Sequence, residues 1–395
     1  MNESNLRSRI RKAIGESDMP ADLSHRTRVA LQQTAAAPPA GRQWIPGAIA
    51  AVLAIAVVAG FFAVGAYNRN HNVPVGPGPK ATVTPLPSPS TSPNSLGVVT
   101  DLAVSSNAVY ALYAPTGTEG PLAGAGTTMV ARIDRRTQAV VKAGPFPGAL
   151  HMAVGSGGVW VAGNRLMLLD ADSLKQLTEI ALPAETAGSI EVVASTAGVW
   201  IAHGGHLYQL DPKTGRTLQT RTFSGIAVSI ALSPNGGRIY VGADTNLSLW
   251  NPGVATIAAF DTTTMNQVAS TQSDGASLGG PRVAAANDAV WVAIATGMQG
   301  HVERRRASDL SHQPVPVAEQ RHSNSVRVYV AGGFVWTTDG QAGRLECLDP
   351  QTGSVLSSKE FPLAGVVAGD SASIYVAGST GFDSLIPDPS CKKMS

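Results

Sequence analysis

Residues 190–222 read IEVVASTAGVWIAHGGHLYQLDPKTGRTLQTRT, a sequence motif with four short runs of strand-forming residues. The runs at 190–194, 199–202, 207–210 and 217–222 are separated by small and polar turn residues. In the turn DPKTG, the Asp hydrogen-bonds its own turn backbone, the Pro fixes φ and the Gly accepts a left-handed conformation. The motif therefore predicts one four-stranded antiparallel sheet with tight turns between its strands.

The same motif occurs seven times between residues 97 and 378, each time with an aromatic residue near the start of the second strand. These aromatic residues are Tyr110, Trp160, Trp200, Tyr240, Trp291, Trp336 and Tyr375, which are 50, 40, 40, 51, 45 and 39 residues apart. A repeat of about 40 to 45 residues with several short strands is typical of a β-propeller. We expect an all-β, seven-bladed β-propeller over residues 96–395. Because the last copy stops early, we expect residues 81–85 to complete the seventh blade.

Residues 45–67 contain no charged side chain and are long enough to span a bilayer. The preceding residues 1–42 hold seven Lys and Arg against four acidic residues. The positive-inside rule then predicts a transmembrane signal-anchor helix over 43–68, with a cytoplasmic N-terminus and the propeller outside the cell membrane. A cleaved signal peptide, cut near Val64-Gly65-Ala66, is the alternative, but the long N-terminal region favours the anchor.

Residues 69–95 form a Pro/Ser/Thr-rich linker with seven prolines between 73 and 95, a composition typical of an extended stalk. The 42-residue basic tail is too short for a domain with a substantial core. Leu6, Ile10 and Ile14 fit one short amphipathic helix, and a solvated tail that only fixes orientation is the other interpretation.

The net charge is +2, from 29 basic and 27 acidic residues, and the tail supplies +3 of it (7 − 4), so residues 43–395 carry −1. Such a nearly neutral region excludes an electrostatic surface for nucleic acid. Both cysteines, Cys347 and Cys391, fall in the part expected outside the cytoplasm, where a disulfide between them would persist. The sequence leaves their pairing open.

Alignment of the blades on the aromatic residue shows one polar column near the start of the first strand, nine residues earlier. Blade four has a turn two residues longer, which assigns Ser229 to this column. Its members are Asp101, His151, Glu191, Ser229, Arg282, Arg327 and Val366. The first strand of a blade is innermost, so we expect this column to surround one mouth of the central channel.

The charges in this column are segregated, with Asp101, His151 and Glu191 on one side and two arginines on the other. The two arginines could clamp a carboxylate or phosphate, while the acidic side meets a cationic or hydroxylated group. Groups that are merely solvated or paired across the opening are the alternative. A metal site on Asp101, His151 and Glu191 is a further, less favoured interpretation, and we predict no metal.

Two other short motifs resemble functional sites but lack the structural context that such sites need. The run Gly275 to Gly279 matches the nucleophile-elbow pattern, but it lies between blades rather than between a strand and a helix. The run Glu303 to Arg306 is interpreted as a solvated outer strand.

The strand pattern Val-Trp-Val-Ala followed by DPKTG resembles the seven-bladed propellers of the quinoprotein amine dehydrogenase-like group with PQQ-like repeats. The resemblance covers residues 97–390. The Ala-rich tail, the single anchor and the Pro/Ser/Thr-rich stalk resemble those of a bacterial membrane-anchored envelope protein. Members of that group include dehydrogenase subunits, lactonase-like enzymes and binding proteins. Repeats that hold the quinone usually carry a Trp after the turn, whereas here Arg216 and Ser354 begin stretches without one. We therefore expect no cofactor.

These observations predict a non-enzymatic, membrane-tethered module that binds a ligand or protein outside the cell. Its partner would be a small molecule, a cell-wall component or an envelope protein, and not nucleic acid. An extracytoplasmic hydrolase or lyase that uses Asp101, His151 and Glu191 is the alternative, and signalling through the cytoplasmic tail is a third.

Overall fold

The computed structural model describes residues 96–115, 128–180, 182, 190–246, 253–277, 280–296, 299–314, 322–323, 326–339, 343–361, 364–370, 373–378, 382–385 and 391. The chain divides into two compact units, 1–85 and 86–395, and the described residues all belong to the second. The predicted tail (1–42), anchor helix (43–68) and linker (69–95) lie outside them. Among the described residues, no helix is long and apolar enough to cross a membrane.

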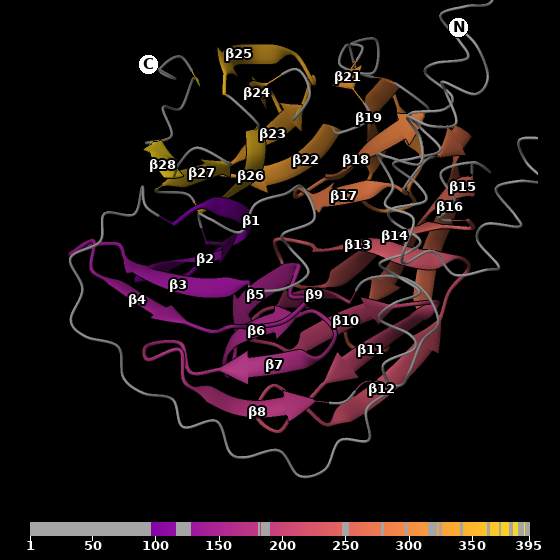
Figure 1. Ribbon diagram of the computed structural model, residues 1–395. Helices are drawn as coiled ribbons and strands as arrows, with labels where there is room; N and C mark the ends of the chain where they lie inside the picture. Colours follow the sequence, from indigo (N-terminus) through magenta and orange to yellow (C-terminus); the bar gives the residue numbers. More distant parts are fainter. Residues whose placement is uncertain are drawn as a thin grey trace, which may run out of the picture. The chain divides into compact units, whose positions relative to one another are not determined.

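The described part is an all-β propeller, as predicted. Each blade is an antiparallel sheet whose strands follow one another from the centre outward. The inner strands lie around one centre, and β1 lies beside β26, so the first and last sheets meet (Figure 1). The innermost strands are β1 (Val98–Val104), β5 (His151–Gly155), β9 (Glu191–Ala194), β13 (Ile226–Leu232), β17 (Arg282–Ala285), β22 (Val326–Ala331) and β26 (Ala364–Gly369).

The outer strands follow in the same blade order. The second strands are β2 (Ala108–Ala114), β6 (Gly158–Ala162), β10 (Val199–His203), β14 (Arg238–Asp244), β18 (Ala289–Thr296), β23 (Phe334–Asp339) and β27 (Ile374–Gly378). The third strands are β3 (Met129–Asp134), β7 (Leu166–Leu169), β11 (His206–Leu210), β15 (Gly253–Asp261), β19 (Gln299–Arg306), β24 (Arg344–Leu348) and β28 (Phe382–Leu385). The fourth strands are β4 (Val140–Ala143), β8 (Gln176–Ile180), β12 (Thr217–Thr222), β16 (Gln267–Ser277), β20 (His312–Gln313) and β25 (Val355–Glu360), and β21 (His322–Ser323) also pairs with β19.

The predicted count of seven complete blades is wrong: six blades have a full set of four strands in the described residues. The remaining sheet, β26-β27-β28, has three described strands. Ten residues follow Leu385 in the sequence, and of these only Cys391 is described, where it forms a disulfide. The segment 81–85, expected to supply the fourth strand, lies outside the described residues.

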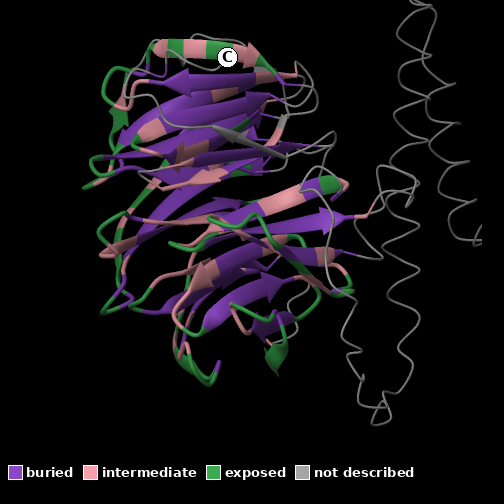
Figure 2. Ribbon diagram, turned by 90° about the vertical axis from the view of Figure 1, so that its left-hand side faces the viewer, coloured by how far each residue is buried: buried purple, intermediate pink, exposed green. Residues whose placement is uncertain are grey.

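The blades pack through the aromatic residues that mark the repeat. All seven are buried, and Trp160, Trp200, Trp291 and Trp336 are at most 2% exposed. Each apolar cluster joins neighbouring blades, as where Trp160 of blade two packs with Val192 of blade three. The inner and middle strands are mostly buried, while the outer strands alternate between exposed and partly buried positions (Figure 2). The core therefore lies between the blades rather than within one sheet.

The turns between third and fourth strands share one geometry. In the turn of blade three, Asp211 Oδ1 accepts the N–H groups of Lys213 and Thr214 at 2.9 and 2.8 Å. The residue four positions after the first turn residue has a positive φ in six blades; these residues are Gln138, Leu174, Gly215, Met265, Leu310 and Gly353. Where the residue is Leu or Met, the side chain is at most 2% exposed. Burial of that side chain offsets the cost of the left-handed backbone.

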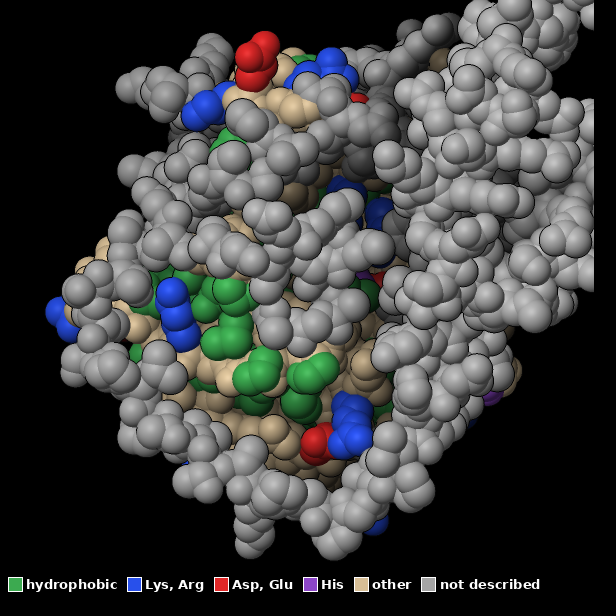
Figure 3. Space-filling model, in the orientation of Figure 1, with side chains coloured by type: hydrophobic (Ala, Val, Ile, Leu, Met, Phe, Trp, Pro, Cys, Tyr) green, Lys and Arg blue, Asp and Glu red, His purple; other side chains and the backbone are tan. Residues whose placement is uncertain are grey.

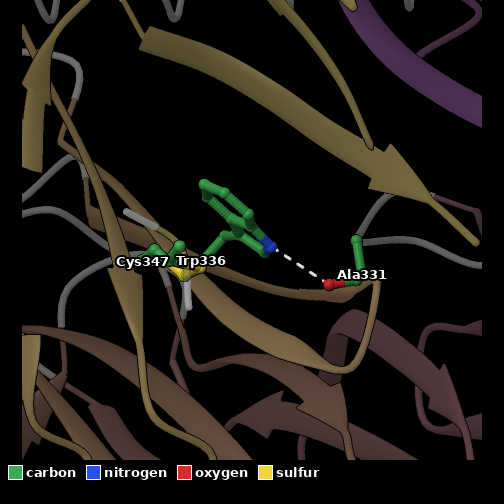
Figure 4. The surroundings of a disulfide bond; sticks show 4 residues. Ala331, Trp336 and Cys347 are labelled. Atoms are coloured by element: carbon green, nitrogen blue, oxygen red, sulfur yellow. Dashed lines mark hydrogen bonds between the residues drawn. A yellow bond between two sulfur atoms is a disulfide. The ribbon is translucent and has the colours of Figure 1, made fainter. Parts of the chain in front are cut away.

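A disulfide joins Cys347 in β24 to Cys391, 44 residues later, with their Cα atoms 6.5 Å apart. It lies beside the indole of Trp336, whose Nε1–H donates to the carbonyl of Ala331 at 3.1 Å (Figure 4). Both cysteines belong to the apolar cluster that joins blades six and seven. The disulfide therefore ties the C-terminal end of the chain to blade six.

Candidate functional site

The polar column occupies one equivalent position in every blade. Each member pairs, across the first hairpin of its blade, with the residue two positions after the aromatic. These pairs are Asp101↔Leu112, His151↔Ala162, Glu191↔Ala202, Ser229↔Gly242, Arg282↔Ala293, Arg327↔Thr338 and Val366↔Ala377. The alignment that assigned Ser229 despite the longer turn therefore matches the backbone register.

All seven column residues line one open cavity of about 440 Å³ in the central channel. Its walls are the seven innermost strands. Acidic, basic and histidine side chains meet in the recess near the centre of the face shown in Figure 3. A cavity of this size with a few convergent polar groups is what a small-molecule site requires.

Asp101 and Ser229 connect neighbouring inner strands. The inner edge of each first strand has no further strand to pair with, so its backbone groups need other partners. Asp101 Oδ2 accepts the N–H of Met152 at 2.6 Å. Ser229 Oγ does the equivalent for Val283 at 3.1 Å and donates to the carbonyl of Pro281 at 2.7 Å. These two residues therefore hold blade one to two and blade four to five.

His151, Glu191 and Arg282 form a second connection across the cavity wall. His151 Nε2 lies 3.1 Å from Glu191 Oε1, and Arg282 Nη1 lies 3.8 Å from the same oxygen. The Glu191 side chain is 5% exposed, whereas those of His151 and Arg282 are 25% and 36% exposed. Arg282 Nη1 also donates to the carbonyl of Val228 at 2.5 Å. The buried carboxylate thus orients a histidine and an arginine that remain accessible from the channel.

Burial raises the pKa of Asp101 from 3.8 to about 6, against the opposing effects of His151 and of two backbone N–H donors. The N–H groups of Met152 and Leu102 stabilise the ionised form of Asp101, but they do not offset the cost of its burial. Asp101 therefore changes its protonation state within the physiological range.

The two arginines have opposite pKa shifts. Burial lowers the pKa of Arg282, and the positive charge of Arg327 lowers it further, against the attraction of Glu191. The neighbouring Tyr329 raises the pKa of Arg327. Tyr329, which was not among the residues expected at the site, also lines the cavity and donates from its hydroxyl to the carbonyl of Gly365 at 3.1 Å. It lies two residues after Arg327, at the position where the other six blades have Ala or Val, and that difference was the available signal.

The interpretation of 303–306 as a solvated strand is wrong for its first three residues. Glu303, Arg304 and Arg305 are 5%, 7% and 4% exposed. Arg305 Nη2 and Nε donate to Glu303 Oε2 at 2.6 and 3.0 Å. Ser273 of blade four and His301 contact the other oxygen at 2.7 and 3.0 Å. Ser273 and Thr271 of β16 contact Glu303 and Arg305. Arg304 instead contacts Asp288, Gln313 and Pro350, so these charges are paired rather than solvated.

Two further alternatives can be compared with the structure. Ser277, the centre of the nucleophile-elbow pattern, is the fully buried last residue of β16, so its context is a propeller strand. Within the described part of the chain, no three His, Cys, Asp or Glu side chains are grouped closely enough to hold a metal ion.

No protein-family model matches the sequence, and no curated protein does. Solved structures match the propeller. A chain of hydrazine synthase from Kuenenia stuttgartiensis is similar with a TM-score of 0.59 and 11% identity over 78% of this chain and 99% of that chain. The β-propeller domain of Cps50 (Swd1) from Myceliophteria thermophila is similar with a TM-score of 0.52 and 12% identity over 74% of this chain and 98% of that domain. BamB from Moraxella catarrhalis has a TM-score of 0.48 and 15% identity over 73% and 85% of the two chains. At these identities the likeness shows the β-propeller fold alone.

Proposed function

We propose that this protein is a non-enzymatic binding module whose ligand site is the mouth of the central channel. One observation carries the proposal: seven equivalent positions converge on a single cavity of about 440 Å³, and six of them are polar or charged. The rest of the inner wall is mostly small and apolar, so the polar groups are confined to one level of the channel. Polar groups placed at one depth in an apolar cavity orient a ligand and select for it.

We further propose that residues 43–68 anchor the module in the cell membrane with the propeller outside. The charge asymmetry around 45–67 supports this orientation. The disulfide between Cys347 and Cys391 is consistent with an oxidising compartment. Protease added to intact cells that make the full-length chain should degrade the propeller and spare residues 1–42. Protection of the propeller until the cells are lysed would contradict this topology.

The binding function is tested by thermal denaturation of the purified full-length chain. The panel holds inorganic phosphate, succinate, glucose, a muramyl peptide, Ca²⁺ and menadione. A compound that raises the melting temperature should lose its effect in the double variant Arg282→Ala/Arg327→Ala. The control is Arg165→Ala/Arg306→Ala, since these arginine side chains are 59% and 54% exposed and lie outside the cavity. No effect from any compound, or an effect unchanged by the first double variant, would contradict the proposal.

A hydrolase or lyase is the second candidate, and the contact between His151 and Glu191 favours it. A buried carboxylate 3.1 Å from an accessible imidazole is an arrangement that orients a general base. Hydrolysis of 4-nitrophenyl acetate and δ-valerolactone by the wild type, lost in His151→Gln, would support the enzyme. Ligand binding without any turnover would support the binding module.

A further inference from the structure

The cavity that we propose as the binding site has opposite charges on opposite walls. Asp101 and Glu191 belong to β1 and β9, and Arg282 and Arg327 belong to β17 and β22. Along the ring, blade four separates blade three from blade five, and blade seven separates blade six from blade one. A ligand at the mouth therefore meets a positive wall and a negative wall at once.

The positive wall is only partly neutralised by the protein. Its two arginines come from adjacent inner strands, and they are close enough for the charge of Arg327 to lower the pKa of Arg282. The carboxylate partner of Arg282 is Glu191 at 3.8 Å, beyond hydrogen-bond distance, and the oxygen involved also contacts His151 at 3.1 Å. Two like charges that face one cavity are stabilised by an anion between them.

On the negative wall, Asp101 can accept more hydrogen bonds than the protein supplies. Its oxygens accept N–H groups from Leu102 and Met152 at 2.9 and 2.6 Å, and both donors are neutral. A carboxylate can accept about four hydrogen bonds, so capacity for a further donor remains. Burial raises the pKa of this group, although the charge of His151 and the two N–H donors act in the opposite direction. A cationic donor at Asp101 would reverse that effect.

Resting on the proposed function, we propose that the ligand is a small dipolar molecule with one anionic and one ammonium group, such as an amino acid. The anionic group binds between Arg282 and Arg327, and the ammonium group binds at Asp101. A simple anion would leave the remaining hydrogen-bonding capacity of Asp101 unused, and a simple cation would be repelled by the two arginines. The dipolar molecule satisfies both walls and adds no net charge to the channel.

The test is calorimetric titration of the full-length chain at pH 7.5 with three probes of similar length: 4-aminobutyrate, butyrate and butylammonium. The inference predicts that 4-aminobutyrate binds at least about tenfold more tightly than either of the other two. Equal binding of butyrate and 4-aminobutyrate would overturn the dipolar inference and leave an anion site. Absence of binding by all three would also overturn it, and the panel described above then decides separately whether the mouth binds anything.

Two variants test the contributions of the negative and the positive wall separately. Asp101→Asn should weaken 4-aminobutyrate about tenfold and leave butyrate unchanged, because only the ammonium contact is lost. Arg327→Gln should weaken both by a similar factor. The matched controls are Asp172→Asn and Arg165→Gln, whose side chains are 80% and 59% exposed and lie outside the cavity. If Asp101→Asn weakens butyrate as much as 4-aminobutyrate, the ammonium is not bound at Asp101 and the inference fails.

Discussion

The Oδ2 atom of Asp101 accepts the backbone N–H of Met152 at 2.6 Å, which joins the inner strands of blades one and two. Ser229 makes the equivalent contact with Val283 between blades four and five. The column that surrounds the channel mouth therefore has two functions. Some members hold adjacent blades together, and the remaining ones present charge to the cavity.

Asp101 makes stability depend on pH. Its pKa is about 6 in the folded chain, above the value of 3.8 for an unperturbed aspartate, so the folded state binds the proton more tightly. Its contribution to the free energy of unfolding is complete below pH 3.8 and is lost as the pH rises through 6. Between about pH 5 and 7.5 this loss is about 1 kcal/mol.

The measurement is urea unfolding of the wild type and of Asp101→Asn at both pH values. The wild type should lose about 1 kcal/mol more than the variant over this interval. The comparison removes the contribution of His151, Glu191, Arg282 and Arg327, which face Asp101 in both proteins. Equal losses in the two proteins would show that Asp101 titrates normally.

The sequence predicts the polar column well because the column depends on local pairing. The residue nine positions before the aromatic is opposite the residue two positions after it whenever the connecting turn has standard length. Contacts between blades could not be predicted in this way. Asp101 accepts from Met152, the residue after the column member of the next blade, but neither this contact nor the one between Glu303 and Ser273 follows from strand pairing within a blade.

Removal of Arg305 should destabilise the fold strongly. Glu303 is buried, and although burial raises its pKa, hydrogen bonds from His301 and Ser273 and the contact with Arg305 lower it to about 2. Arg305→Met leaves this carboxylate without its cation, at a cost of about 3–5 kcal/mol in urea unfolding. The double variant Glu303→Leu/Arg305→Met should recover part of that loss. A single variant as stable as the wild type would mean that the pair is not needed.

The disulfide should stabilise the last two blades. It closes a loop of 44 residues, for which the chain-entropy model gives roughly 3–4 kcal/mol. Cys391→Ser should lower the free energy of unfolding by that amount, and dithiothreitol should destabilise the wild type but not the variant. If the reductant destabilises both proteins equally, the effect does not come from this bond.

Two glycines with positive φ should differ in their response to substitution by alanine. A Cβ at Gly215 (φ +69°) would lie 2.2 Å from Ile180 Cδ1, whereas one at Gly333 (φ +82°) meets no atom within 4 Å. Gly333→Ala isolates the backbone strain, about 1 kcal/mol, and Gly215→Ala adds the steric clash, so it should cost more. Thermal unfolding of both variants measures the difference. Equal costs would mean that Ile180 moves aside freely.

The most direct test of the channel-mouth site is a methyl NMR spectrum of the full-length chain labelled at methionine. Met152 lines the cavity, whereas Met265 is a buried turn residue of blade four outside it. A compound that stabilises the chain, or 4-aminobutyrate, should shift the Met152 methyl resonance and leave that of Met265 in place. A shift of Met265 with an unchanged Met152 resonance would place the ligand elsewhere and contradict the proposed function.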